Sequence, residues 1–258
     1  MQIALTIAGS DSGGGAGIQA DLKTFHRFGV YGTTVVTAIT AQNTRGVAGW
    51  MAVPCDLITA QLREVVADLP PAAVKSGMLA DADVVRTVAA GLRAHHLSPY
   101  VLDPVMVATS GDPLLERDAI AAIREELIPL ADLVTPNLDE AAILVGEAVG
   151  DEDAMAGAAR AMVEVHGARA ALVKGGHLAG AEMLDVLFDG ELHLFRHARL
   201  DTTSTHGTGC TLSSAIAAHL ALGYPLREAV EQSLDYVHRA IASAPGLGGG
   251  HGPLNHFA

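Results

Sequence analysis

The chain has 258 residues, 50% of them hydrophobic, and its 29 acidic residues outnumber its 16 basic ones, for a formal net charge of −13. So much apolar sequence supports a buried core rather than intrinsic disorder, and the acidic balance argues against binding to duplex DNA or to an anionic membrane. No window reaches the ~18 apolar residues of a membrane span, and no basic residue precedes the first apolar stretch. We therefore expect a cytoplasmic protein that binds neither nucleic acid nor membrane.

Strand and helix patterns alternate along the chain. Residues 1–8 are apolar enough for a buried strand, and the glycine-rich segment 9–17 joins them to a helix expected over 18–28. The β-branched run at 33–40 predicts a second strand. Further helices are expected at 56–67, 81–95, 117–127, 138–145, 152–166, 211–222 and 226–243, and further strands at 72–75, 99–102, 132–134 and 169–173.

The order of these elements predicts the fold class. Strand-then-helix order with short loops implies parallel pairing, because parallel strands need a crossover, and it gives an α/β sheet with helices on both faces. One antiparallel hairpin is expected, between strands at 183–188 and 192–195. No linker and no long repeat interrupts residues 1–258, so we expect a single domain.

Polar residues follow several predicted strands. Ligands bind beyond the carboxyl ends of the strands in an open α/β sheet, so we expect these residues to converge along one edge. Lys75 is given no role, because a lysine there also fits an edge residue with a buried stem and a solvated head. The strand-end segments are Gly9-Ser10-Asp11, Gln42-Asn43, Lys75-Ser76, Asp103-Pro104, Thr135-Pro136-Asn137 and Lys174-Gly175-Gly176.

Two glycine-rich segments stand out. The first, residues 13–17, matches neither the dinucleotide fingerprint nor a P-loop, and it fits either a tight turn or a close approach of backbone to a ligand. The second, residues 205–210, precedes an apolar helix, where peptide N–H groups can cradle phosphate. The helix field would favour the thiolate of Cys210 as a nucleophile or proton acceptor, although a buried structural cysteine is the alternative. His206 lies in the same loop, not opposite Cys210, so a cysteine protease is not indicated.

Oxygen ligands and one ammonium complete the candidate chemistry. Asn137 and Glu140 have the spacing of a capping box, and they could also reach Mg²⁺ as hard oxygen ligands. Asp103 projects a carboxylate from a strand end, and Lys174 can place an ammonium on a phosphate. Neither Cys55 nor Cys210 lies in a pattern with zinc spacing, and no disulfide framework is indicated.

Taken together, these residues resemble the hydroxymethylpyrimidine/phosphomethylpyrimidine kinases of thiamine biosynthesis, members of the ribokinase-like superfamily. The motifs occur in order and at family spacing over nearly the whole chain. They occupy residues 5–11, 14–25, 37–44, 75–79, 102–106, 110–112, 135–141, 173–177, 206–211 and 252–257.

The resemblance implies a three-layer ribokinase-like fold and an enzyme that uses ATP and Mg²⁺. Its substrates would be 4-amino-5-hydroxymethyl-2-methylpyrimidine and then the monophosphate, and superfamily analogy suggests a homodimer. Gln42 would hydrogen-bond the aminopyrimidine edge, which suits an amide with one donor and one acceptor side. Gly9, Ala16, Asp21, Met78 and Val105 match the rest of the pyrimidine pocket.

The same resemblance assigns the phosphate side of the site. Lys174, with Asn137 and Thr208, would contact ATP, while Asp103 and Glu140 would organise Mg²⁺. Cys210 stands where most superfamily sugar kinases have a catalytic Asp, and it would take or relay the proton of the hydroxymethyl group. The N–H groups of Gly207, Thr208, Gly209 and Cys210 would hold the transferring charge.

Two positions depart from the family, and two other functions fit part of the pattern. Gly13 stands where Ser is usual, and Thr109 stands where many members have Lys. A pyridoxine or pyridoxal kinase shares the fold and the ATP site, but Gln42 and Cys210 favour the pyrimidine. A non-catalytic pyrimidine sensor is the other alternative, and it would need neither a metal site nor a base.

Overall fold

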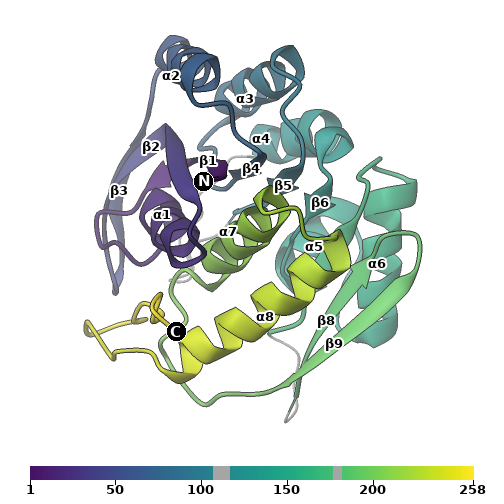
Figure 1. Cartoon of the computed structure of the whole chain (residues 1–258). Coiled ribbons are helices and arrows are strands. Elements are labelled where there is room, and N and C mark those ends of the chain that lie inside the picture. Colours follow the sequence, from purple (N-terminus) through teal and green to yellow (C-terminus); the bar gives the residue numbers. More distant parts are fainter. Residues whose placement is uncertain (107–116, 177–181) are drawn as a thin grey trace.

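A computed structural model describes residues 1–106, 117–176 and 182–258. Within these residues the strands form one nine-stranded sheet in the order β3-β2-β1-β4-β5-β6-β7-β8-β9 (Figure 1). The motif Ser110-Gly111-Asp112, together with Thr109 and His177, lies outside the described residues. The strands are β1 Ile3–Ser10, β2 Tyr31–Asn43, β3 Gly46–Ala52, β4 Ala73–Ser76, β5 Tyr100–Leu102, β6 Leu133–Val134, β7 Ala171–Lys174, β8 Glu182–Phe188 and β9 Leu192–Ala198.

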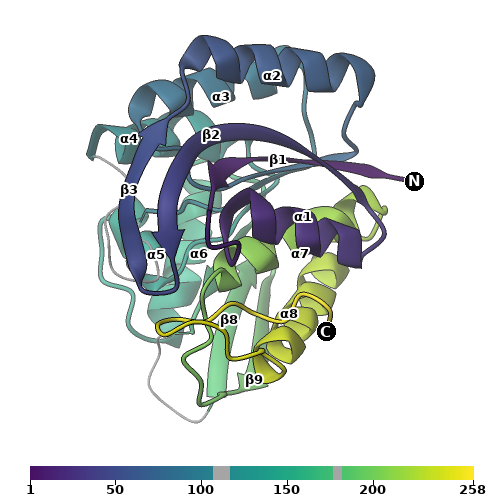
Figure 2. The ribbon, with the colours of Figure 1, turned by 90° about the vertical axis from the view of Figure 1, so that its left-hand side faces the viewer.

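The helices cover both faces of this sheet, as the sequence predicted. Figure 2 shows α2 and α3 on one side of the strands, and α1, α7 and α8 on the other. In the part of the chain that the structure describes, no helix combines the length and apolar composition needed to cross a bilayer. The α-helices are α1 Gly17–Arg27, α2 Cys55–Asp68, α3 Ala82–Ala94, α4 Arg117–Ala122, α5 Leu138–Val145, α6 Glu152–Glu164, α7 Thr208–Ala221 and α8 Leu226–Ala242.

The core consists of two layers, one on each face of the sheet. Successive strand residues point to opposite faces, so Leu5 packs with α2 to α6 while its neighbour Ala4 packs with α1, α7 and α8. On β4, Val74 packs in the same layer as Leu5, and Ala73 packs in the same layer as Ala4. Both faces are buried, which explains why these parallel strands are nearly continuous apolar runs.

The parallel part of the sheet has a topological switch point. β1 pairs in parallel with β2 on one side and with β4 on the other, and β5, β6 and β7 follow outward from β4. The chain order therefore reverses beside β1, which is where open α/β sheets form a ligand crevice beyond the strand ends. Ser10 and Ser76 end the two strands at this point.

One expectation about the sheet was wrong. Among the described residues, three pairs of consecutive strands are antiparallel: β8 with β9, as predicted, β7 with β8, and β2, which extends to Asn43 and returns as β3. No strand pattern is visible in the sequence of β3, because Gly46 and Gly49 lie in it and much of it is solvent-exposed. The expected helix at 117–127 also departs from α geometry, since residues 123–127 form a π-helical turn.

Candidate active site

The two glycine-rich segments lie against one another. Gly207 caps α7 with a left-handed φ of 82°, and a Cβ atom there would overlap the carbonyl group of Gly15. A Cβ atom on Gly15 would in turn lie 2.5 Å from Cδ2 of His206. Only glycine permits both the backbone angle and the close approach. The tight turn expected in the first segment is confirmed, since Gly14 and Gly17 have positive φ angles of 77° and 55°. The close approach to a ligand stays a prediction.

Asp11 organises the first glycine loop. Its carboxylate accepts backbone hydrogen bonds from Gly13, Gly15 and Ala16 at 2.8, 3.0 and 2.8 Å, and it pairs with Nε2 of His206 at 2.9 Å. Burial would raise the pKa of Asp11, but the hydrogen bonds from His206 and from these backbone groups outweigh it and lower the pKa. A charged Asp11 thus holds the loop at the start of α1 against the loop that begins α7.

Four of the predicted pyrimidine-pocket residues lie at or near the carboxyl ends of strands. A Cβ atom on Gly9 would lie 3.2 Å from Sδ of Met78, and Val105 packs against the small cluster that contains Met78. Gln42, near the end of β2, has Nε2 3.5 Å from Nε2 of His206. Ala16, a fifth predicted pocket residue, directly precedes α1. The strand ends therefore bring Gly9, Gln42, Met78 and Val105 toward one edge, as expected.

Asp21, the other predicted pocket residue, lies elsewhere. Its side chain has no exposed surface, and its carboxylate is bound by Lys75 at 2.9 Å and by the hydroxyl groups of Thr6 and Ser214 at 2.6 Å. The structure places Asp21 in the core between α1 and α7, not at the pocket surface. Lys75, which was given no role because it also fitted an edge residue with a solvated head, has its ammonium fully buried in this ion pair.

The phosphate side of the site is built around Lys174. Its Nζ lies 3.2 Å from Oδ1 of Asp103, and Ser213 on α7 donates to Oδ2 of the same carboxylate at 3.3 Å. A Cβ atom on Gly209 would lie 3.2 Å from Nζ of Lys174, so the start of α7 faces this ammonium. Burial would lower the pKa of Lys174, but Asp103 and Glu140 together raise it. Lys174 is therefore charged.

Asn137 and Glu140 form the capping box that the sequence allowed. The Glu140 N–H donates to Oδ1 of Asn137, and the Asn137 N–H donates to Oε2 of Glu140, each at 2.9 Å. Burial raises the pKa of Glu140 to about 7; Lys174 opposes this rise and Asp103 adds to it. The cap does not exclude a ligand role, because a carboxylate retains lone pairs after two hydrogen bonds.

These residues fit Mg²⁺. Asp103 and Glu140 are two buried carboxylates beside one ammonium, which leaves negative charge for a hard cation to neutralise. Among the described residues, no group of three or more His, Cys, Asp or Glu side chains is arranged to hold a metal ion. Mg²⁺ is commonly held by one or two carboxylates with phosphate oxygens and water, so a cation here would need the phosphates of a nucleotide as further ligands.

The start of α7 provides a cradle of N–H groups. The Thr208 N–H and Oγ1 both bond to the carbonyl of Thr205, at 3.2 and 2.8 Å. The N–H groups of Gly209 and Cys210 have no acceptor among the described residues. The cradle predicted at residues 207–210 therefore has its free donors at Gly209 and Cys210, where an anion can accept from both.

The protonation state of Cys210 differs from the expected thiolate. Burial raises the pKa of its thiol to about 11, and the positive charge of Lys75 opposes this rise. The expected thiolate was wrong, because the loss of water around the sulfur outweighs the helix field. The residue keeps some exposed surface, so the protonated thiol remains within reach of a ligand.

Sequence reasoning missed several residues of this site. His206 was considered only as a protease partner, Asp11 was given no role, and Asp185 was overlooked although its carboxylate accepts from the Gly175 N–H at 3.0 Å. An acidic residue two to five positions before a run of glycines is the one signal that could have pointed to Asp11. The others depend on contacts between distant segments.

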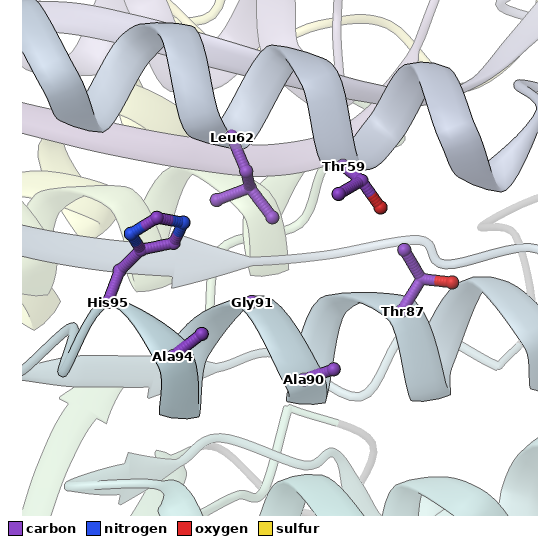
Figure 3. Close-up of a pocket in the computed structure, with 7 residues that line it drawn as sticks. All are labelled: Thr59, Leu62, Thr87, Ala90, Gly91, Ala94 and His95. Carbon is purple, nitrogen blue, oxygen red and sulfur yellow. The ribbon is translucent and has the colours of Figure 1, made fainter.

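A hollow of about 310 Å³ lies away from this site. It is formed between α2 and α3, and none of the predicted site residues lines it (Figure 3). It therefore contributes nothing to the chemistry described above. Its lining consists of Thr59, Leu62, Thr87, Ala90, Gly91, Ala94 and His95.

One sheet between two layers of helices, with an N–H cradle beside the buried Lys174 and Asp103 pair, is the arrangement of ribokinase-like small-molecule kinases. Residues 11–255 match the family model of phosphomethylpyrimidine kinase. The hydroxymethylpyrimidine/phosphomethylpyrimidine kinase of Rhizobium meliloti (strain 1021) is 56% identical over 99% of this chain and 97% of that protein. The chain belongs to the phosphomethylpyrimidine kinase family and is a phosphotransferase.

Solved structures agree with this assignment. The phosphomethylpyrimidine kinase of Clostridium difficile 630 is 41% identical, with a TM-score of 0.84 over 93% of this chain and 100% of that chain. An ADP complex of Bacillus subtilis pyridoxal kinase is 37% identical, with a TM-score of 0.92 over 99% of this chain and 97% of that chain. The expected ribokinase-like fold is thus confirmed, and the neighbour's ADP supports the use of ATP.

Proposed function

We propose that this enzyme transfers the γ-phosphoryl group of ATP to 4-amino-5-hydroxymethyl-2-methylpyrimidine and then a second phosphoryl group to the monophosphate, in thiamine biosynthesis. The contact between Gly207 and Gly15 carries this proposal. It sets the N–H cradle of α7 directly against the loop that borders the pyrimidine pocket. A hydroxymethyl group in that pocket is then next to the place where a phosphoryl group is held.

The pocket residues bind and orient the pyrimidine. The Gln42 amide accepts from the exocyclic amine and donates to the adjacent ring nitrogen, which is the pairing an aminopyrimidine edge requires. The apolar side chains of Met78 and Val105 flank the ring, and Gly9 leaves room for it. Orientation of this kind removes much of the entropic barrier of a two-substrate reaction.

The cradle and Lys174 bind the phosphates. Free N–H groups at Gly209 and Cys210 and the ammonium of Lys174 point at charge that grows during transfer, and such preorganised donors stabilise it. Asn137, at the start of α5, contacts ATP. Thr208 contributes its backbone to the cradle that binds the phosphates. When bound by Asp103 and Glu140, Mg²⁺ neutralises phosphate charge.

Cys210 relays the proton of the hydroxymethyl group. Its protonated thiol lies at the cradle, so it relays the hydroxymethyl proton rather than holding a standing negative charge. Phosphoryl transfer depends mainly on positioning and charge stabilisation, so a weak base suffices.

An ADP-release assay tests this function. We expect turnover on the hydroxymethylpyrimidine and on its monophosphate, with dependence on Mg²⁺, and weaker turnover on pyridoxal. Pyridoxal turnover above that of both pyrimidines would establish the pyridoxal kinase alternative. Binding of the pyrimidine without any ADP release would favour the sensor.

Three broader expectations accompany the proposal. We place the reaction in the cytoplasm, in a homodimer of single-domain chains that each span residues 1–258. Size-exclusion chromatography with light scattering tests the dimer.

A further inference from the structure

Gln42 lies where the strand pairing of β2 becomes irregular. The last pair in the register of β1 with β2 joins Ser10 to Ile39, so β1 ends before it reaches Gln42. On the other side, the register of β2 with β3 shifts between Ala41 and Gln42. Such bulges re-aim side chains and are common next to active sites. The direction of the Gln42 side chain therefore depends on contacts outside the regular sheet.

The hydroxyl group of Ser12 takes the place of a strand partner for Gln42. It accepts a hydrogen bond from the Gln42 N–H at 2.8 Å and donates one to the Gln42 carbonyl at 2.9 Å. Two residues of an antiparallel pair exchange the same two kinds of bond. Ser12 follows Asp11, whose carboxylate joins the first glycine loop to His206. The backbone of Gln42 is thus fixed to the loop that borders the proposed pyrimidine pocket.

The C-terminal segment holds the same hairpin at its turn. The His251 N–H donates to the carbonyl of Thr44, in the turn between β2 and β3, at 2.8 Å. A Cβ atom on Gly250 would overlap this carbonyl. A Cβ atom on Gly248, which has a φ of 86°, would overlap the Thr44 side chain. Residues 248–251, which we call the C-terminal clamp, therefore need glycine to come this close to the hairpin.

Both holding contacts lead to the same junction. Nε2 of Gln42 lies 3.5 Å from Nε2 of His206, so the carboxamide is directed toward the place where the first glycine loop meets the cradle. The backbone N–H of His206 in turn donates to the carbonyl of Gly252, directly after the clamp, at 3.1 Å. A shift of the hairpin turn would therefore move the carboxamide relative to the proposed pocket.

We propose that Ser12 and the C-terminal clamp position Gln42 and thereby set the affinity of the site for the aminopyrimidine edge. A carboxamide that pairs with one donor and one acceptor must be held in one orientation, because a rotated amide presents its two groups in the wrong order. Ser12 fixes the backbone of Gln42, and the clamp fixes the turn that follows it. This inference rests on the proposed contact of Gln42 with the pyrimidine, whereas the holding contacts themselves do not.

Ser12→Ala removes both hydrogen bonds to the Gln42 backbone. We expect the KM for the hydroxymethylpyrimidine to rise by about tenfold, as on loss of one or two hydrogen bonds, with little change in the KM for ATP. Ser12→Thr keeps the hydroxyl group and should restore the KM for the pyrimidine. Ser243→Ala is the matched control, since its hydroxyl also donates to a backbone carbonyl, that of Arg239, and accepts from Asn255. It should leave both KM values in place.

Gly250→Ala tests the clamp. The added methyl group would overlap the carbonyl of Thr44 and displace the turn. A displacement of about 1 Å can cost up to about 10²-fold, so we expect the KM for the pyrimidine to rise by about 10- to 100-fold with little change in the KM for ATP. Gly150→Ala is the matched control, because nothing lies within 4 Å of its Cβ position. It should change neither KM.

A double-mutant cycle shows whether these residues act through Gln42. In a Gln42→Ala background the carboxamide is absent, so Ser12→Ala and Gly250→Ala should have no further effect on the KM for the pyrimidine. Effects that multiply would overturn the proposal, because the free-energy effects of independent sites add. An equal rise in the KM for ATP would also overturn it, since it would show a general loss of structure.

Hydrogen exchange of backbone amides separates this proposal from the proposed function, because it needs no substrate. We expect faster exchange at Gln42 in Ser12→Ala and at His251 in Gly250→Ala. Unchanged exchange would overturn the holding contacts. Faster exchange with an unchanged KM for the pyrimidine would overturn the positioning role and leave the pyrimidine kinase activity intact.

A wild type that prefers pyridoxal to both pyrimidines would overturn the proposed function instead. A raised KM for pyridoxal in Ser12→Ala and Gly250→Ala would then keep the positioning role of these residues. An unchanged KM for pyridoxal would overturn that role as well.

Discussion

Gly207 approaches Gly15 so closely that no side chain fits between the start of α7 and the loop before α1. This contact joins the proposed phosphate cradle to the proposed pyrimidine pocket through backbone alone. Its rigidity follows from Asp11 and His206, which bond to one another across the same junction at 2.9 Å. The distance between the two binding regions is therefore set by the fold and not by a mobile side chain.

Gly15→Ala should separate the two loops. The added methyl group would lie 2.5 Å from Cδ2 of His206, and such overpacking typically costs ~1–3 kcal/mol. We expect a lower Tm in thermal unfolding and a raised KM for the pyrimidine in the ADP-release assay. Gly157→Ala is the matched control, because nothing lies within 4 Å of its Cβ position on α6 and the helix gains ~0.5–1 kcal/mol. Equal effects of the two substitutions would contradict the proposed junction.

Lys174→Met should remove the ammonium that faces the cradle. We expect kcat to fall by about 10²–10³, as on loss of a preorganised donor, because Asp103 and Glu140 would then repel the phosphates unopposed. Steady-state kinetics with varied ATP measures the loss. Lys174→Arg keeps the charge and should recover part of the rate, and a Met variant as active as the Arg variant would argue against a phosphate contact.

Cys210→Ala should slow phosphoryl transfer while substrates still bind. Loss of a group that moves a proton typically costs about 10²–10⁴ in rate, so we expect kcat to fall within that range with modest changes in KM. Cys210→Ser keeps a group that can relay a proton, and it should retain more activity than the Ala variant. Near-normal turnover in Cys210→Ala would remove the cysteine from the mechanism.

Glu140 should make stability depend on pH. Its pKa is raised from 4.5 to about 7, so the folded protein binds this proton more tightly than the unfolded chain does. The stability that this proton provides is present below about pH 4.5 and is lost as pH rises through about 7. Between about pH 4.5 and 7, the Tm of the wild type in thermal unfolding should therefore fall by more than the Tm of Glu140→Gln.

A bound cation should oppose this loss of stability, and more strongly in the wild type than in Glu140→Gln. Mg²⁺ with a nucleotide would neutralise the Glu140 carboxylate, so it should raise the Tm of the wild type above pH 7 by more than that of Glu140→Gln. Parallel pH profiles of the two proteins would show that Glu140 does not carry the raised pKa.

The sequence predicted the parallel sheet because each strand is buried on both faces and is separated from the next by an amphipathic helix. It could not predict β3, whose residues are largely exposed and include Gly46 and Gly49. It placed the start of the helix at residue 211, although α7 begins at Thr208, since glycine-rich sequence carries little helical signal.

Some residues of the site could also be predicted from the sequence and others could not. Residues at strand ends, such as Asp103 and Lys174, were found because topology brings strand ends together. The pair of Lys75 and Asp21 was missed because a charged residue in sequence gives no sign of being buried 54 positions from its partner. The ionisation of Cys210 was mistaken because burial depends on everything packed around it.

The contacts that shape this site join segments very distant in sequence. Asp11 and His206 are 195 positions apart, Asp21 and Ser214 are 193 apart, and Asp103 and Ser213 are 110 apart. Closing such long loops is entropically expensive, and chains dominated by non-local contacts fold slowly. A folding intermediate that lacks α7 would have its sheet but no cradle, so the recovery of activity during refolding should lag behind the recovery of secondary structure.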